Sequence, residues 1–198
     1  MKRVVTGHNA AGKSVVLFEG EPNRVSRFPN LPGLCIEELW ATEPNPQVPI
    51  NGADPTVTMT NFIAPLGGTR LRMEYYPPDA RLAELAAKGE IDMAQAGAEF
   101  AAAMPDLAAV IEPDFMHTTD TVDYNIVLVG ELWCELDDGV EVHLQAGDCL
   151  QMWRSSRLAQ QGRRNLYQGG RYGWSYAQVT QRPLIMRDSI SHGHNIRR

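Results

Sequence analysis

The 198-residue sequence predicts an all-β domain of the β-barrel or jelly-roll class, with a short helical insertion. Two observations lead to this prediction. Short apolar or alternating runs recur through residues 1–78, and Gly, Pro or Asn bounds each of them. A second β region, 125–150, holds a strand–turn–strand unit whose turn is Asp137-Asp138-Gly139. Because 43% of the residues are hydrophobic, the chain can bury one sizeable core.

The N-terminal region, 1–78, is predicted to form a strand-rich arm and part of the barrel. Five runs are apolar or alternating: 3–6, 14–19, 34–40, 57–63 and 71–76. Pro77-Pro78 ends the series, because proline has no N–H to donate to a β-ladder.

Residues 79–110 have a different composition and are predicted to be a helical insertion. The stretch is rich in alanine and is broken by Gly89, Gly97 and Pro105. Apolar residues recur at helical spacing, as at Leu82 and Leu85. We therefore expect two or three short helices that pack against the strands.

Residues 111–151 contain the second β region and are predicted to be the core of the barrel. Residues 125–129 have the composition of a buried strand, and 131–136 alternate between polar and apolar. The chain returns over 140–144, and Ala146-Gly147-Asp148 turns it into the next strand. Strands and turns at this spacing predict an antiparallel meander.

A phosphate-binding motif is matched near the N-terminus, but its context favours a hairpin. Residues 7–14 read GHNAAGKS and fit the pattern GxxxxGK[ST]. That motif needs a helix that starts at Lys13, whereas a short β-branched run follows and stops at Gly20. We expect Asn9 and Gly12 to shape a turn, and a nucleotide site stays a distant alternative.

The charge and cysteine content restrict the location and the partners. The net charge of −6 combines 9 basic and 23 acidic residues in 1–151 with nine arginines and Asp188 in 152–198. Arginines interleaved with aromatics suit nucleic acid, but no nucleic-acid-binding fold accompanies them. Three cysteines at unrelated spacings indicate no disulfide framework. With no apolar run of membrane-helix length and no signal peptide, we expect a cytoplasmic protein with no membrane partner.

Residues 117–130 read HTTDTVDYNIVLVG, and this segment resembles the first motif of the cupin superfamily. It is most similar to small single-domain cupins with the motif H-x-T-D-T-V-D-Y, and the match covers residues 113–150. The resemblance implies a jelly-roll barrel (a double-stranded β-helix, as in RmlC-like proteins) that binds a small molecule and pairs as a homodimer.

The same resemblance implies a set of site residues. Cupins commonly hold a divalent metal with two histidines and a carboxylate of this motif. His117 occupies the first position, Asp123 the carboxylate position, and Thr119 stands where the second histidine is usual. The ion would be Fe, Mn, Ni or Zn, although a threonine hydroxyl is a poor ligand. Tyr124 and Trp133 are candidate substrate-binding aromatics at the barrel mouth.

Two classes of function remain open at this point. One is a metal-free small-molecule binding protein that uses the barrel cavity, and the threonine at the second ligand position favours it. The other is a metal-dependent enzyme of the oxygenase, isomerase or cyclase type, with His117 and Asp123 as ligands.

The second cupin motif is absent, and residues 152–198 form an atypical basic tail. After Gly147-Asp148 a cupin continues with a glycine and a histidine three places later, but residues 151–165 of this chain contain no histidine. Codons can be chosen for the residues from Trp153 onward such that the resulting DNA, read one base later, encodes GARHAWRN. This peptide contains that glycine and histidine. We infer that residues from about 152 onward are translated out of frame.

Sequencing the gene across codons 145–180 tests this inference. We expect a one-base insertion or deletion near codon 152 whose correction restores the G-x-x-H motif. An intact reading frame in the source DNA would refute the inference, and the chain would then be a cupin with a rebuilt C-terminus.

Overall fold

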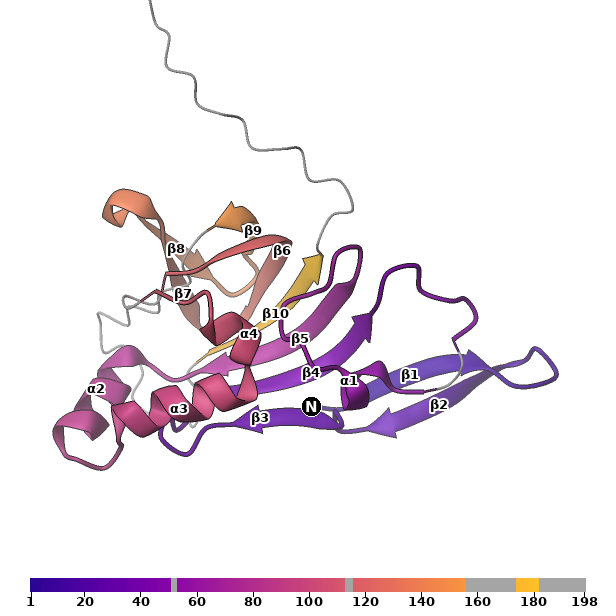
Figure 1. Cartoon of the computed structure of the whole chain (residues 1–198), viewed down its shortest axis with the longest axis horizontal. Coiled ribbons are helices and arrows are strands. Elements are labelled where there is room, and N and C mark those ends of the chain that lie inside the picture. The colour runs from indigo at the N-terminus through magenta and orange to yellow at the C-terminus, as the bar shows by residue number, and fades with distance from the viewer. Residues whose placement is uncertain (51–52, 113–115, 156–173, 182–198) are drawn as a thin grey trace, which may run out of the picture.

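A six-stranded antiparallel sheet is the centre of the computed structural model, which describes residues 1–50, 53–112, 116–155 and 174–181. Its strand order is β3-β4-β5-β10-β6-β9, and β1-β2 and β7-β8 form two further two-stranded sheets (Figure 1). The strands are β1 (Arg3–His8), β2 (Ser14–Gly20), β3 (Arg24–Arg27), β4 (Cys35–Thr42), β5 (Thr69–Tyr76), β6 (Thr118–Val129), β7 (Glu131–Glu135), β8 (Glu141–Gln145), β9 (Cys149–Ser155) and β10 (Trp174–Gln181). The helices are α1 (Pro55–Thr58), α2 (Asp79–Ala87), α3 (Met93–Ala103) and α4 (Pro105–Ala108).

The expected N-terminal hairpin is confirmed, because β1 and β2 pair antiparallel. The Asn9 side chain accepts the N–H groups of Ala11 and Lys13, and Gly12 adopts a φ of 74°. A strand follows Lys13 where a phosphate-binding loop needs a helix, so the nucleotide-site alternative is wrong.

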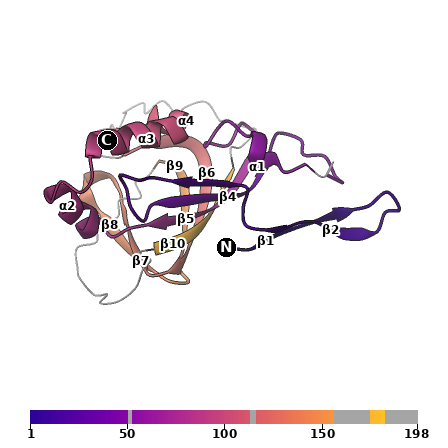
Figure 2. The ribbon, with the colours of Figure 1, turned by 90° about the horizontal axis from the view of Figure 1, so that it is seen from below.

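The β1–β2 hairpin extends away from the body of the molecule, at the end opposite α2 (Figures 1 and 2). Polar contacts hold its base: Arg3 pairs with Asp54, and the terminal ammonium pairs with Glu37. Burial alone raises the pKa of Asp54, but hydrogen bonds from Arg3, Thr56 and Asn23 outweigh it and lower the pKa to about 2. The Asp54 carboxylate at the base of the hairpin therefore stays ionised until strongly acidic pH.

The strand predicted over 57–63 is wrong. Asp54 caps a short helix, α1, by accepting the N–H of Thr56, and Pro55 occupies its first turn. The chain after α1 is a loop whose N–H groups at Phe62 and Ile63 donate to Asp106 of α4. These backbone donors are satisfied by a carboxylate, so they do not enter a β-ladder.

Three helices, α2, α3 and α4, occupy the stretch for which helices were expected. Asp92 caps α3 by accepting the N–H groups of Ala94 and Gln95. Met104 and Leu107 join a buried apolar cluster beneath β4 that also contains Phe28, Leu34 and Ile36. The helices therefore cover one end of the sheet, as expected from their apolar spacing.

The predicted meander is replaced by two nested hairpins. The outer strands β6 and β9 pair with each other, and the inner strands β7 and β8 pair with each other. The backbone at Gly147, between β8 and β9, explains the nested arrangement. Its N–H donates to the carbonyl of Val127 in β6, so it does not close a tight turn between β8 and β9. Nested hairpins of this kind are typical of jelly rolls.

The basic tail contributes the strand β10 to the middle of the sheet, between β5 and β6. The strands at the two edges of this sheet are β3 and β9. The rest of the tail beyond residue 155 lies outside the described residues. The strand-rich class is confirmed, whereas closure into a jelly-roll barrel stays a prediction, because the described strands form separate sheets.

One face of the six-stranded sheet carries buried polar residues, and we call it the covered face. Strand register places three rows of side chains on it, because Cα partners on neighbouring strands point to the same side. Each row crosses β10, whose side chains are not described, and the rows are Ile36–Glu74–Val127, Glu38–Arg72–Asn125 and Ala41–Arg70–Asp123. All nine residues are buried.

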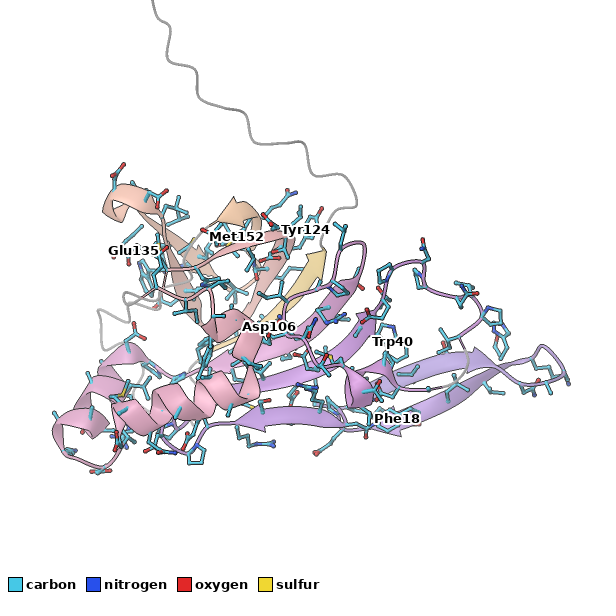
Figure 3. All side chains as sticks on the ribbon, viewed as in Figure 1. Phe18, Trp40, Asp106, Tyr124, Glu135 and Met152 are labelled. Carbon is cyan, nitrogen blue, oxygen red and sulfur yellow. The ribbon has the colours of Figure 1, made fainter. Side chains whose placement is uncertain are left out.

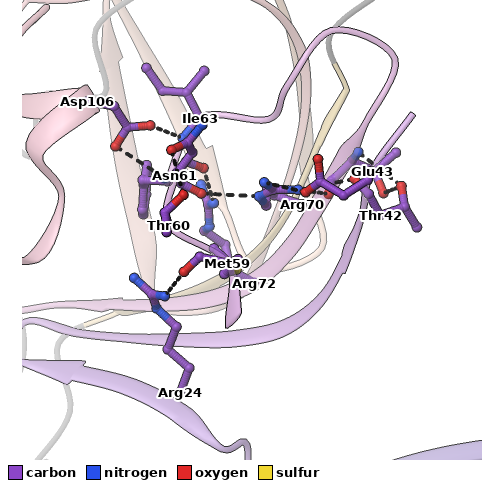
Figure 4. A network of polar contacts seen from close by, with 12 residues as sticks. Arg24, Thr42, Glu43, Met59, Thr60, Asn61, Ile63, Arg70, Arg72 and Asp106 are labelled. Carbon is purple, nitrogen blue, oxygen red and sulfur yellow. Dashed lines mark hydrogen bonds and ion pairs between the residues drawn. The ribbon is translucent and has the colours of Figure 1, made fainter. Parts of the chain in front are cut away.

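Arginines on and beside the covered face hold the loop that follows α1 (Figure 4). Arg72 pairs with Glu38 at 3.3 Å, donates to the carbonyl of Phe62 at 2.6 Å and lies 3.6 Å above the Phe62 ring. Arg70 donates to the carbonyl of Asn61, and Arg24 to that of Met59. The loop backbone is therefore bonded on both sides, by arginines and by Asp106.

Replacing Arg72 with Met tests the importance of this network. The change leaves the buried carboxylates of Glu38 and Glu74 without their cation, so we expect the free energy of unfolding to fall by about 3–5 kcal/mol. Urea denaturation gives the value. Arg81→Ala is the control, since its exposed pair with Glu84 is worth less than about 1 kcal/mol. Equal losses in the two variants would contradict the prediction.

Candidate functional site

A cavity of about 450 Å³ lies beside the start of β6. Its volume is in the range of small-molecule sites. Its walls come from the chain just before β6 and from the turn between β7 and β8, and the lining residues are Glu112, Met116, His117, Thr118, Leu136, Asp137 and Val140. The lining includes two carboxylates and one imidazole, with apolar groups between them.

His117, the first predicted ligand, lines this cavity. A bridge to Ile111 holds its backbone, and the neighbouring Glu112 N–H donates to Met116 at 2.7 Å. The Nδ1 atom of His117 is shielded from solvent and has no hydrogen-bond partner in the described part of the chain. This nitrogen is therefore available to a bound group.

Polar side chains follow His117 along β6, and the register places Asp123 and Asn125 on the covered face. Thr119 and Thr121 bond each other at 2.7 Å through their hydroxyls. Asp123 and Asn125 come next and are 8% and 1% exposed. A row of polar groups thus continues from the cavity at His117 into the buried face of the sheet.

The predicted metal ligands do not form a three-ligand centre. Asp123 lies six residues from His117, a separation of roughly 20 Å in a regular strand, although the pairing of β6 with β9 shifts between Thr118 and Val122. Within the described residues, no group of three or more His, Cys, Asp or Glu side chains is placed to hold an ion. Thr119 bonds Thr121, so its hydroxyl is engaged. The described residues do not fit a catalytic metal with three protein ligands.

The two predicted aromatic residues lie away from the cavity. Tyr124 is on the opposite side of β6 from Asp123 and is 41% exposed (Figure 3). Trp133 stacks on His143 with ring centroids 4.3 Å apart, and His143 Nε2 lies 2.7 Å from Glu131. On the other side of β7, Leu132 and Cys134 pack against Val127 and Leu144.

Cys35, Cys134 and Cys149 do not line the cavity. None of the three forms a disulfide, and Cys134 is fully buried. Burial raises the pKa of the Cys134 thiol, so it stays protonated and unreactive at neutral pH.

Sequence reasoning did not single out Asn125, Glu112 or Asp137. The alternation Asp123-Tyr124-Asn125-Ile126 contained a signal, because period-two spacing places Asn125 on the same side as Asp123. Glu112 and Asp137 are far apart in sequence and meet only through the nested hairpins, so no local pattern could reveal them.

No family model and no curated protein matches the sequence. Among solved structures, the chain is similar to ethanolamine utilization protein Q (EutQ) of Salmonella typhimurium LT2, with 10% identity, a TM-score of 0.38 and coverage of 92% of this chain and 96% of that chain. It is also similar to EutQ of Clostridium difficile, with 11% identity, a TM-score of 0.37 and 98% coverage of both chains. At similarities this low, the function proposed below depends on this chain's own residues.

In the described part of the chain, no helix combines the length and the apolar character needed to cross a membrane.

Proposed function

We propose that this is a cupin-fold protein that binds a small organic molecule, which enters at the cavity beside His117. The motif at 117–130 and the nested hairpins support the cupin fold. One observation carries the function: a cavity of about 450 Å³ opens at the start of the strand whose inward side chains are Thr119, Thr121, Asp123 and Asn125. Such a cavity with a few polar groups is the usual form of a ligand site.

The lining indicates what such a molecule must offer. Glu112 and Asp137 supply negative charge, and none of the described residues that line this cavity is a lysine or an arginine. Met116, Leu136 and Val140 supply apolar surface. A compact molecule with an apolar body and hydrogen-bond donors fits this lining better than an anion does.

Filling the cavity tests the proposal. Leu136→Trp adds an indole to its wall, so we expect fragments that bind the wild-type protein to lose at least tenfold in affinity. Thermal-shift screening followed by calorimetry measures this. Val142→Trp is the matched control, because Val142 is 37% exposed and does not line the cavity. If both variants bind fragments as the wild type does, the ligand site lies elsewhere.

A metal-dependent enzyme is the second proposal, and the unpartnered Nδ1 of His117 favours it. The cupin resemblance names His117 and Asp123 as ligands for Fe, Mn, Ni or Zn, and the two would hold one ion only if the chain departs from a regular strand between Thr118 and Val122, where its pairing with β9 shifts. An ion there would act as a Lewis acid. No step is assigned to it, since the described residues offer two ligands where three are usual.

Metal analysis separates the two proposals. For the binding protein we expect less than one tenth of an equivalent of metal after dialysis, and fragment binding that EDTA leaves unchanged. One equivalent of metal that is lost in both His117→Ala and Asp123→Asn would establish the enzyme proposal instead.

We also propose a homodimer that pairs through the β1–β2 hairpin in the cytoplasm. The hairpin extends from the body, and Val4 and Val16 on it are 48% and 56% exposed. An isolated two-stranded hairpin is marginally stable in water, so a second copy that covers these valines would stabilise it. Three free cysteines suit a reducing compartment.

Light scattering after size exclusion tests the dimer. We expect twice the monomer mass for the wild type and the monomer mass for Val16→Asp, because a carboxylate at the contact is costly to bury. Val57→Asp serves as the control, since Val57 is 61% exposed but lies on α1. A monomeric wild type contradicts this proposal.

A further inference from the structure

Asn125 is the most deeply buried polar side chain of β6, and the described protein does not satisfy it. It is 1% exposed, and neither its Nδ2 nor its Oδ1 has a hydrogen-bond partner in the described part of the chain. A buried polar group without a partner costs roughly 1–3 kcal/mol. A residue with this cost needs a reason, and a bound molecule is one such reason.

The orientation of β6 buries Asn125 at a cost. Val127 packs against the β7–β8 hairpin and is 3% exposed, and Asp123 and Asn125 are buried on the same side of the strand. Tyr124, Ile126 and Leu128 are 41–43% exposed on the other side. The strand therefore buries an amide without a partner while three apolar side chains stay exposed.

The neighbours of Asn125 restrict the chemistry of that ligand. Asp123 is next on the covered face, and Arg72 lies two strands away, about 10 Å across the sheet. Arg72 is already bonded to Glu38 and to the Phe62 carbonyl. Among the described side chains of this face, the ionisable group closest to Asn125 is therefore the carboxyl of Asp123.

Asn125 offers one donor group and one acceptor, side by side in a plane. A carboxylate would accept from Nδ2, leave Oδ1 unpaired and repel Asp123. An ammonium group would donate to Oδ1 and leave Nδ2 unpaired. A neutral group with an adjacent N–H and C=O satisfies both atoms at once, as in the cis-amide edge of a lactam or cyclic imide.

We propose that Asn125 binds the amide edge of a lactam-like or imide-like ligand on the covered face. This inference rests on the proposed small-molecule function and deepens it. Asn125 pairs its Oδ1 with the ligand N–H and its Nδ2 with the ligand carbonyl, while Asp123 disfavours anionic competitors.

The experiment compares 2-pyrrolidone and hydantoin with N-methyl-2-pyrrolidone, which has lost the N–H. We expect the wild-type protein to bind the first two at least roughly tenfold more tightly, as measured by NMR titration, because the methylated probe leaves Oδ1 unpaired. In Asn125→Leu and Asn125→Ala this preference should vanish.

A second readout distinguishes recognition from a structural role. Leucine has nearly the shape of asparagine and no polar atom, so Asn125→Leu should raise the unfolding midpoint of the ligand-free protein by about 2–6 °C. Asn30→Leu is the matched control, because the Asn30 side chain donates to Glu99 and accepts the N–H of Asp92. Its midpoint should fall, and it should keep the probe preference.

Each other outcome overturns the inference. If Asn125→Leu lowers the midpoint or fails to fold, Asn125 has a structural partner. If the wild type binds fragments without preferring probes that keep the N–H, Asn125 does not hydrogen-bond the ligand, although the proposed binding function stands. If no fragment binds the wild type at all, the proposed function itself fails.

Discussion

The buried guanidinium of Arg72 is the interaction on which the rest of the structure depends. It is 1% exposed and balances Glu38 and Glu74 on the covered face, while its bond to the Phe62 carbonyl fixes the loop over that face. Tyr76 adds a hydrogen bond of 2.5 Å to Glu74. A charge buried this deeply is stable only when every partner is in place. Ion pairs and hydrogen bonds therefore hold the β4–β5 half of the face together, whereas Asn125 in the β6 half has no hydrogen-bond partner among the described residues.

The electrostatics of the two halves differ for a reason visible in the sequence. No lysine or arginine occurs between Lys88 and Arg154, and β6, β7 and β8 fall within this stretch. Asp137, which lines the cavity, lies in this stretch. The arginines of β5 are engaged with Glu38, Glu43, Glu74 and loop carbonyls. The cavity should therefore select against anions.

Local patterns predicted the elements that local interactions determine. The two hairpins at Gly12 and Gly139 followed from turn chemistry, and the helices followed from spacing. The prediction over 57–63 was wrong because Asp106, more than forty residues away, binds that backbone. The orientation of β6 was also out of reach, since alternation cannot say which side is covered. Packing of Val127 against β7 and β8 decides it.

The wall of the cavity is well suited to recognition because both faces of the β7–β8 hairpin are fixed. Leu132, Cys134 and Leu144 pack against Val127 on one face, and Trp133 stacks on His143 on the other. The turn that carries Leu136, Asp137 and Val140 closes through the Val140 N–H, which donates to Asp137. Such a turn does not have to be ordered when a ligand binds, so less conformational entropy is lost. A preformed wall of this kind places the affinity of the cavity in its apolar contacts. Asn125 lies eight residues after His117 in the chain, so its buried amide adds specificity for a ligand that reaches the covered face.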